Sequence, residues 1–359
     1  MKSLSEVYSD KRVLITGDTG FKGTWLVHWL KLLGAEVFGL ALPAESNSLF
    51  KSTSLERVIT HIDGDLRDFE NTRNIVQEIA PDFVFHLAAQ ALVIESYESP
   101  QPTFMSNVGG TLNVLEAVRV RDKSCSVVVV TTDKCYENSE WVFAYRENDP
   151  MGGHDPYSAS KGCAELLVAS YQRSFFNGGP IRCGTARAGN VIGPGDWAKD
   201  RIVPDIMRSI FNSSELEIRN PNSIRPWQHV LEPLSGYLTL GAHLAGESGL
   251  NYCQPYNFGP RPESARSVGE IVQLLAASPG VDINHRISDD AGPHEAKYLK
   301  LSIDRAIAEL NWNPVWDFET TLEKTWTGYR DINIADVSAS TVVNQQIESY
   351  CSDSKSSYY

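Results

Sequence analysis

The sequence predicts an α/β protein, with a doubly wound parallel sheet and a smaller C-terminal lobe. Three observations lead to this prediction. Short runs of β-branched residues alternate with helical patterns through the first half of the chain, which is typical of parallel strands joined by right-handed crossover helices. A cluster of glycines directly follows the first of these runs. Beyond residue 187 the alternation gives way to loops rich in glycine and proline.

The alternation begins with R-V-L-I-T at residues 12–16, a strand that enters a tight turn. Apolar residues then recur every three or four positions as far as Gly34, which predicts a helix with one buried face. A second strand at 36–42 completes a β-α-β unit. The same pattern predicts later strands at 60–65, 82–89 and 126–132, and helices at 71–79, 103–121 and 157–176. This order of elements is that of a Rossmann-type fold.

The chain of 359 residues divides into three predicted segments. Residues 1–186 form the sheet domain, and residues 187–330 form mainly the smaller lobe, interleaved with the sheet and carrying helices near 204–211 and 231–244. Residues 331–359 contain Ser, Asn and Tyr without periodicity, which predicts a flexible tail.

Composition excludes several classes of protein. With 42% hydrophobic and 21% charged residues the chain is an ordinary globular protein. The 32 basic and 45 acidic residues give a formal net charge of −13, which disfavours nucleic acid and membrane surfaces as partners. No apolar run is long enough to span a bilayer and the first residues lack a signal-peptide core, so a cytoplasmic location is expected. Six separate cysteines and scattered histidines predict no metal site.

The glycine cluster is T-G-D-T-G-F-K-G, with Gly17, Gly20 and Gly23 between the first strand and the first helix. Glycines at this point let the backbone approach a pyrophosphate at the positive N-terminus of the helix, so we predict a dinucleotide cofactor here. The second strand ends without the acidic residue that usually holds the adenosine ribose, and Glu45 comes only later. The choice between NAD and NADP therefore stays open at this position.

Two further strand ends are candidates for the cofactor site. Asp65, at the end of the third predicted strand, could accept a hydrogen bond from the adenine amino group, or it could cap the next helix. The small residues in H-L-A-A-Q at 86–90 allow a cofactor to lie close to the chain. His86 itself is expected to be a core histidine with its hydrogen bonds satisfied.

The strongest chemical pattern combines T-T-D-K after the valine-rich strand with Y-S-A-S-K at the start of a long helix. Tyr157 and Lys161 are four residues apart on one helical face, where an ammonium group can lower the pKa of a phenol and also donate to a nicotinamide ribose. Tyr157 would then be a usable base near neutral pH, with Thr132 bonded to the same substrate hydroxyl. The alternative is a core tyrosine and a surface lysine.

Over residues 12–326 these motifs resemble the extended short-chain dehydrogenase/reductase family, and within it the nucleotide-sugar 4,6-dehydratases. Four segments look like the branch that acts on CDP-D-glucose: T-G-D-T-G-F-K-G-T-W at 16–25, T-T-D-K-C-Y at 131–136, R-P-W-Q-H-V-L-E-P-L-S-G-Y-L at 225–238, and P-H-E-A-K-Y-L-K-L at 293–301. The resemblance implies NAD as cofactor. The implied cofactor site comprises Gly17, Thr19, Gly20, Phe21, Lys22, Gly23, Asp65, Leu66, Leu87, Ala88, Ala89, Tyr157 and Lys161.

The resemblance also implies a lyase reaction. Tyr157, assisted by Thr132, takes the proton of the glucosyl C4 hydroxyl while hydride passes to NAD. Lys134 then takes the C5 proton and Asp133 protonates the departing C6 hydroxyl, after which hydride returns to C6. The products are CDP-4-dehydro-6-deoxy-D-glucose and water. Lys134 stands where the dTDP-glucose branch has a glutamate. A lysine acts as a base only when it is neutral. The alternative is that Asp133 and Lys134 form an ion pair with each other and take no part in the reaction.

Substrate contacts are expected from Arg187, Asn190, Arg201, Arg225 and Tyr256. The arginines suit a diphosphate, although a salt bridge would also explain them. Tyr256 or Trp197 could stack on the cytosine, although core packing explains either equally well.

The family implies a homodimer or tetramer, built on the helices at 103–121 and 157–176, and a place in 3,6-dideoxyhexose synthesis for lipopolysaccharide O-antigen. The competing functions are a nucleotide-sugar epimerase, a dehydratase for another nucleotide, and a non-catalytic NAD-binding regulator.

Overall fold

The structure, a computed structural model, describes residues 2–278, 281–288 and 298–354. Its centre is a sheet of seven parallel strands in the order β3-β2-β1-β4-β5-β6-β11. The strands are β1 (Arg12–Thr16), β2 (Glu36–Ala41), β3 (Thr60–Asp63), β4 (Phe83–His86), β5 (Cys125–Val130), β6 (Ile181–Ala188) and β11 (Pro255–Phe258). The predicted fold class, a Rossmann-type doubly wound sheet, is confirmed.

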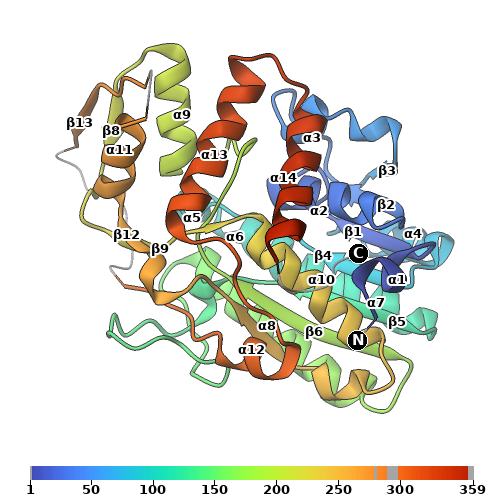
Figure 1. Ribbon diagram of the computed structural model, residues 1–359. Helices are drawn as coiled ribbons and strands as arrows, with labels where there is room; N and C mark the ends of the chain where they lie inside the picture. Colours follow the sequence, from blue (N-terminus) through green and yellow to red (C-terminus); the bar gives the residue numbers. More distant parts are fainter. Residues whose placement is uncertain (1, 279–280, 289–297, 355–359) are drawn as a thin grey trace.

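Helices cover both faces of this sheet because successive strand residues point to opposite sides. Val13 and Ile15 pack on one face and Leu14 on the other. The first face carries α2 (Phe21–Leu32) and α10 (Leu231–Ala245), and the second carries α4 (Phe69–Ile79), α7 (Gly110–Arg121) and α8 (Pro156–Tyr171). Figure 1 shows α10 in front of the sheet, with α7 and α8 behind it.

Two predicted helices are divided in the structure. The segment predicted at 103–121 consists of α6 (Pro100–Phe104), a π-helical turn (Met105–Gly109) and α7. The helix predicted at 157–176 ends as α8 at Tyr171 and continues as a second π-helical turn (Gln172–Phe176).

The remaining elements are short or belong to the second half of the chain. They are α1 (Leu4–Tyr8), α3 (Leu49–Ser52), α5 (Val93–Glu98), α9 (Ile202–Asn212), α11 (Val268–Ala276), α12 (Asp304–Leu310), α13 (Phe318–Asn333), β7 (Val191–Ile192), β8 (Leu216–Ile218), β9 (Ile224–Pro226), β10 (Gln228–His229), β12 (Ala265–Ser267) and β13 (His285–Ile287). None of the described helices is both long and apolar enough to cross a bilayer.

A smaller lobe stands beyond the sheet and has its own apolar core. Met207 of α9, Ile218 of β8, Ile271 of α11 and Trp326 of α13 pack together in it, and Figure 1 shows these elements at the upper left. The predicted boundary between residues 186 and 187 falls inside β6, and β11 returns to the central sheet beside β6. The division into domains stays a prediction.

The prediction of a flexible tail is wrong for residues 339–353, which form α14 (Ala339–Asp353). Val343 and Ile347 belong to the main core, and the Tyr350 hydroxyl donates to Glu232 Oε2 at 2.7 Å. Figure 1 shows α14 beside α2. The apolar residues recur at helical spacing, but the serine, asparagine and glutamine on the other face conceal the pattern. Residues 355–359 lie outside the described part of the chain.

Candidate active site

The glycine turn joins β1 to α2 and leaves room for a ligand at the N-terminus of the helix. Gly20 is the N-cap residue of α2, and no side chain caps this end. A Cβ atom at Gly20 would meet only the carbonyl oxygen of Gly17, at 3.4 Å, so the space beyond is open. Uncapped N–H groups at a helix N-terminus bind anions. This geometry fits the pyrophosphate of a dinucleotide.

Gly17 holds the turn against the end of β4. Its φ is +78°, and a Cβ atom there would lie 2.7 Å from the backbone nitrogen of Ala88. Gly178 has nearly the same φ, +76°, with nothing within 4 Å of such a Cβ.

We expect Gly17→Ala to lower the free energy of unfolding by about 2–4 kcal/mol, since backbone strain and overpacking add together. Gly178→Ala introduces the backbone strain without overpacking, so it should lower the free energy of unfolding by about 1 kcal/mol. Urea denaturation measures both variants, and equal losses would contradict the close approach at Gly17.

Asp18, a buried residue of the turn, forms a pair with a half-buried histidine that the sequence analysis missed. His61 Nδ1 on β3 lies 2.7 Å from Asp18 Oδ2, and a Cβ atom at Gly39 would meet that oxygen at 2.0 Å. Burial raises the pKa of Asp18, and the hydrogen bond with Asp18 raises the pKa of His61. The only sequence signal was an acidic residue inside the glycine motif, because His61 lies 43 positions away.

The other residues predicted to contact the cofactor lie after β3 and β4 or in the glycine turn, and several of them already have hydrogen-bond partners within the protein. Asp65 accepts hydrogen bonds from Arg67, which hold the pKa of its carboxyl below the usual range. The residue that caps α4 is Asp68 rather than Asp65. Thr19 donates to the carbonyl of Leu42, and the carbonyl of Leu66 accepts from Asn113. Leu87, Ala88 and Ala89 follow β4, where the Ala88 backbone touches the glycine turn.

His86 is a satisfied core histidine, as predicted. Its Nδ1 lies 2.7 Å from Thr16 Oγ1 and its Nε2 lies 3.0 Å from Thr111 Oγ1. Burial lowers the pKa of His86 to about 3, so the ring is neutral and takes a structural role.

A cleft of about 290 Å³ lies between the carboxyl ends of the strands and the smaller lobe. Nine of the predicted residues line it: Phe21, Lys22, Thr132, Asp133, Lys134, Tyr157, Asn190, Arg201 and Arg225. Parallel strands end at one edge of a sheet, and a ligand cleft is expected there. The fold therefore brings together residues as distant in sequence as Phe21 and Arg225.

Tyr157 lies in the first turn of α8, which begins with Pro156 and is capped by Asp155. Burial raises the pKa of Tyr157 to about 12, while its hydrogen bond with Thr132 acts in the opposite direction. An effect of Lys161 on this pKa stays a prediction. Lys161 Nζ donates to the carbonyl of Val130 at 3.2 Å, and burial lowers the pKa of Lys161 to about 8.

Asp133 and Lys134 lie in a short turn (Asp133–Cys135) that follows β5. The Thr132 hydroxyl donates to Asp133 Oδ1 at 3.0 Å. A Cβ atom at Gly189 would meet Asp133 Oδ2 at 2.4 Å, so only glycine fits beside the carboxyl group. Burial raises the pKa of Asp133, and the nearby charge of Lys134 lowers it. A buried carboxyl group with a raised pKa is suited to donate a proton.

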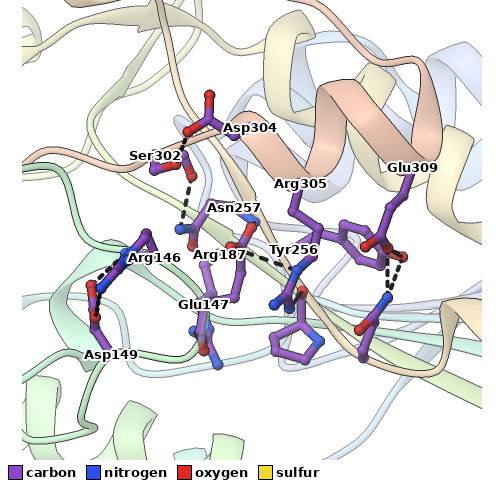
Figure 2. A network of polar contacts seen from close by, with 12 residues as sticks. Arg146, Glu147, Asp149, Arg187, Tyr256, Asn257, Ser302, Asp304, Arg305 and Glu309 are labelled. Atoms are coloured by element: carbon purple, nitrogen blue, oxygen red, sulfur yellow. Dashed lines mark hydrogen bonds and ion pairs between the residues drawn. The ribbon is translucent and has the colours of Figure 1, made fainter.

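Two predicted substrate residues lie outside the cleft. Arg187 is 3% exposed, pairs with Glu165 at 2.8 Å and does not line this cleft. Tyr256 is fully buried in β11, and its hydroxyl donates to Glu309 at 2.7 Å. Figure 2 shows Tyr256 beside Glu309, in a group of polar side chains that also includes Arg187. Neither residue is placed to bind the substrate.

The lobe contributes charged residues that sequence reasoning missed. Lys199 and Arg219 line the cleft, and Arg219 lies 3.5 Å from Asp200. Arg201 pairs with Asp196 at 3.0 Å. The charge-rich segment D-W-A-K-D-R at 196–201 was the available signal for this group. Trp197, an alternative for cytosine stacking, also lines the lobe core against Tyr329.

The parallel sheet, the open glycine turn and the Tyr157–Lys161 pair define a protein of the extended short-chain dehydrogenase/reductase class. The chain belongs to the GDP-mannose 4,6-dehydratase family, whose family model matches residues 14–325. The resemblance predicted from the motifs is thereby confirmed.

Individual relatives agree with this assignment. A CDP-glucose 4,6-dehydratase of Salmonella typhimurium is 48% identical over 91% of this chain and 94% of its own length. A dTDP-glucose 4,6-dehydratase of Xanthomonas campestris is 28% identical over 88% of this chain and 92% of its own.

Solved structures share the fold. A dTDP-glucose 4,6-dehydratase from Streptomyces venezuelae with NAD bound has a TM-score of 0.74 at 23% identity, covering 89% of this chain and 97% of that chain. A UDP-glucose 4-epimerase from Brucella ovis in complex with NAD also has a TM-score of 0.74, at 22% identity, covering 88% and 98%.

Proposed function

We propose that this protein is an NAD-dependent lyase that converts CDP-D-glucose to CDP-4-dehydro-6-deoxy-D-glucose and water. The observation that carries the reaction is the meeting of Thr132, Asp133, Lys134 and Tyr157 in one cleft. The nucleotide is taken from the 48% identical relative, which is a CDP-glucose 4,6-dehydratase.

The side chains of the cleft divide the proton transfers between them. Tyr157, as phenolate, takes the proton of the C4 hydroxyl, and its contact with Thr132 lowers the pKa of Tyr157 against the larger effect of burial. The ketone formed at C4 acidifies the C5 hydrogen. Lys134 takes the C5 proton, and the Asp133 carboxyl donates its proton to the C6 hydroxyl, which leaves as water. When bound, NAD supplies a reversible hydride acceptor.

The same residues define where each ligand lies. The uncapped N-terminus of α2 would hold the pyrophosphate of NAD, and Lys161, which follows Tyr157 by one turn on α8, would donate to the nicotinamide ribose. Asn190, Arg201 and Arg225 line the cleft on the lobe side and are suited to the diphosphate and sugar of the substrate.

Incubation with CDP-, dTDP-, GDP- and UDP-glucose, each with NAD, tests this function. We expect mass spectrometry to find the loss of one water from CDP-glucose and no comparable loss from the other three. Heat-denatured protein is the control. Equal water loss from dTDP-glucose would overturn the nucleotide assignment, and no loss from any substrate would overturn the lyase assignment.

A dimer is proposed on the helices behind the sheet. Apolar side chains that are exposed in the single chain gather on α5 to α8 and the adjoining π-helical turns: Tyr97, Phe104, Met105, Leu112, Leu166 and Phe175. Exposed apolar side chains on neighbouring helices favour association with a second copy. We further propose a role in 3,6-dideoxyhexose synthesis for lipopolysaccharide O-antigen, in the cytoplasm, on the basis of the product class.

A further inference from the structure

A buried ion pair lies directly beneath the catalytic residues. Glu165 follows Tyr157 and Lys161 at intervals of four residues, so all three occupy one face of α8. Glu165 is 5% exposed, and its carboxylate accepts hydrogen bonds from Thr131, from Thr185 at 2.8 Å and from Arg187 at 2.8 Å.

Arg187 extends this contact to the other side of the catalytic turn. One terminal nitrogen donates to the Tyr136 hydroxyl at 2.7 Å and to the carbonyl of Glu147 at 3.0 Å. Figure 2 shows Arg187 among polar side chains that include Glu147 and Asn257. The Tyr136 hydroxyl in turn donates to Asn257 Oδ1 at 2.7 Å.

These contacts bracket the residues that carry the chemistry. Thr131 immediately precedes Thr132, and Tyr136 immediately follows the turn that holds Asp133 and Lys134. Glu165 accepts from Thr131, and Arg187 donates to Tyr136. The ion pair between Glu165 and Arg187 joins these two contacts. The turn that bears Asp133 and Lys134 is therefore flanked on both sides by one buried, hydrogen-bonded connection.

We propose that Glu165 and Arg187 are positioning residues, which clamp both ends of the turn bearing Asp133 and Lys134 and place a negative charge beneath Lys161. For its kinetic consequence this inference rests on the proposed lyase function. The charge of Glu165 also raises the pKa of Lys161 against the larger effect of burial. Without that charge, Lys161 should lose its proton at a lower pH.

The electrostatic half of the proposal is tested by NMR titration of lysine-labelled protein, with Lys161→Arg used to assign the signal. We expect Glu165→Gln, which keeps an oxygen for Thr131, to move the Lys161 titration midpoint down by about one pH unit. Thr185→Val removes a neutral hydrogen bond from the same carboxylate and should leave the midpoint in place. An unchanged midpoint in Glu165→Gln would overturn this half.

The positioning half is tested by kinetics with CDP-glucose. Tyr136→Phe removes the link to Arg187 and should lower kcat about tenfold or more with little change in KM, because a misplaced turn affects the chemistry rather than the binding. Tyr145 stacks on Tyr136 at 5.2 Å and its hydroxyl donates to Asn138, so Tyr145→Phe is the matched control and should keep full kcat.

Equal kcat values for the two tyrosine variants would overturn the clamp. Both substitutions remove only an oxygen atom, so loss of the fold does not obscure the comparison. If the unmodified protein releases no water from CDP-glucose, the proposed function is wrong. The NMR titration does not depend on turnover, so it would still show whether the charge of Glu165 raises the pKa of Lys161.

Discussion

Replacing Tyr157 with phenylalanine is expected to lower turnover of CDP-glucose by about 10²–10⁴-fold and to leave the content of bound NAD unchanged. The phenol oxygen is the proposed acceptor of the C4 proton, and it is hydrogen-bonded with Thr132. The ring remains and keeps its packing. Turnover is followed by mass spectrometry, and NAD content by absorbance after release from the protein.

Tyr256→Phe is the matched control for this experiment. Tyr256 is also a buried tyrosine, but it lies in β11 and its hydroxyl reaches Glu309 rather than the cleft. It should keep full turnover. A Tyr157→Phe variant with full activity would contradict the proposed base, and loss of activity in Tyr256→Phe would restore that residue as a substrate contact.

Tyr350→Ala is expected to lower the free energy of unfolding by about 3–5 kcal/mol, because the substitution empties a fully buried aromatic site. The ring packs edge-on against Trp29 and Trp316, with centroids 5.6 and 5.1 Å away. The change also removes the hydroxyl that donates to the buried carboxylate of Glu232. Urea denaturation measures the loss.

Gln345→Ala supplies the control on the same helix. Gln345 is exposed on α14, so its replacement should change the free energy of unfolding by no more than about 0.5 kcal/mol. If both variants lose the same small amount, α14 does not pack as the structure has it, and the sequence-based expectation of a flexible tail would be the better description.

Much of the fold could be predicted because its signals are local. The β-branched runs, the helical spacing after the glycine turn and the breakdown of the alternation after residue 187 all lie within short windows of sequence. Thr132, Asp133 and Tyr157 were found for the same reason, since they follow a strand or begin a helix. The parallel order of the strands then brings these ends to one edge.

The errors concern contacts between distant residues. Arg187 looks like any arginine after a strand, and its partner Glu165 lies 22 positions earlier on another element. Tyr256 pairs in register with Ala186, and both side chains join the core. The spacing of Tyr157 and Lys161 predicts a shared helical face but not where the lysine nitrogen points, and here it reaches a backbone carbonyl.

The most direct test of the proposed reaction uses CDP-glucose that carries deuterium at C4. Transfer within one active site predicts a product that has lost one water and carries the deuterium at C6, as NMR and mass spectrometry would both find. Asp133→Asn, which removes the acid for the C6 hydroxyl, should leave the water in place. Deuterium that remains at C4 after water loss, or that is lost to solvent, would contradict the proposed mechanism.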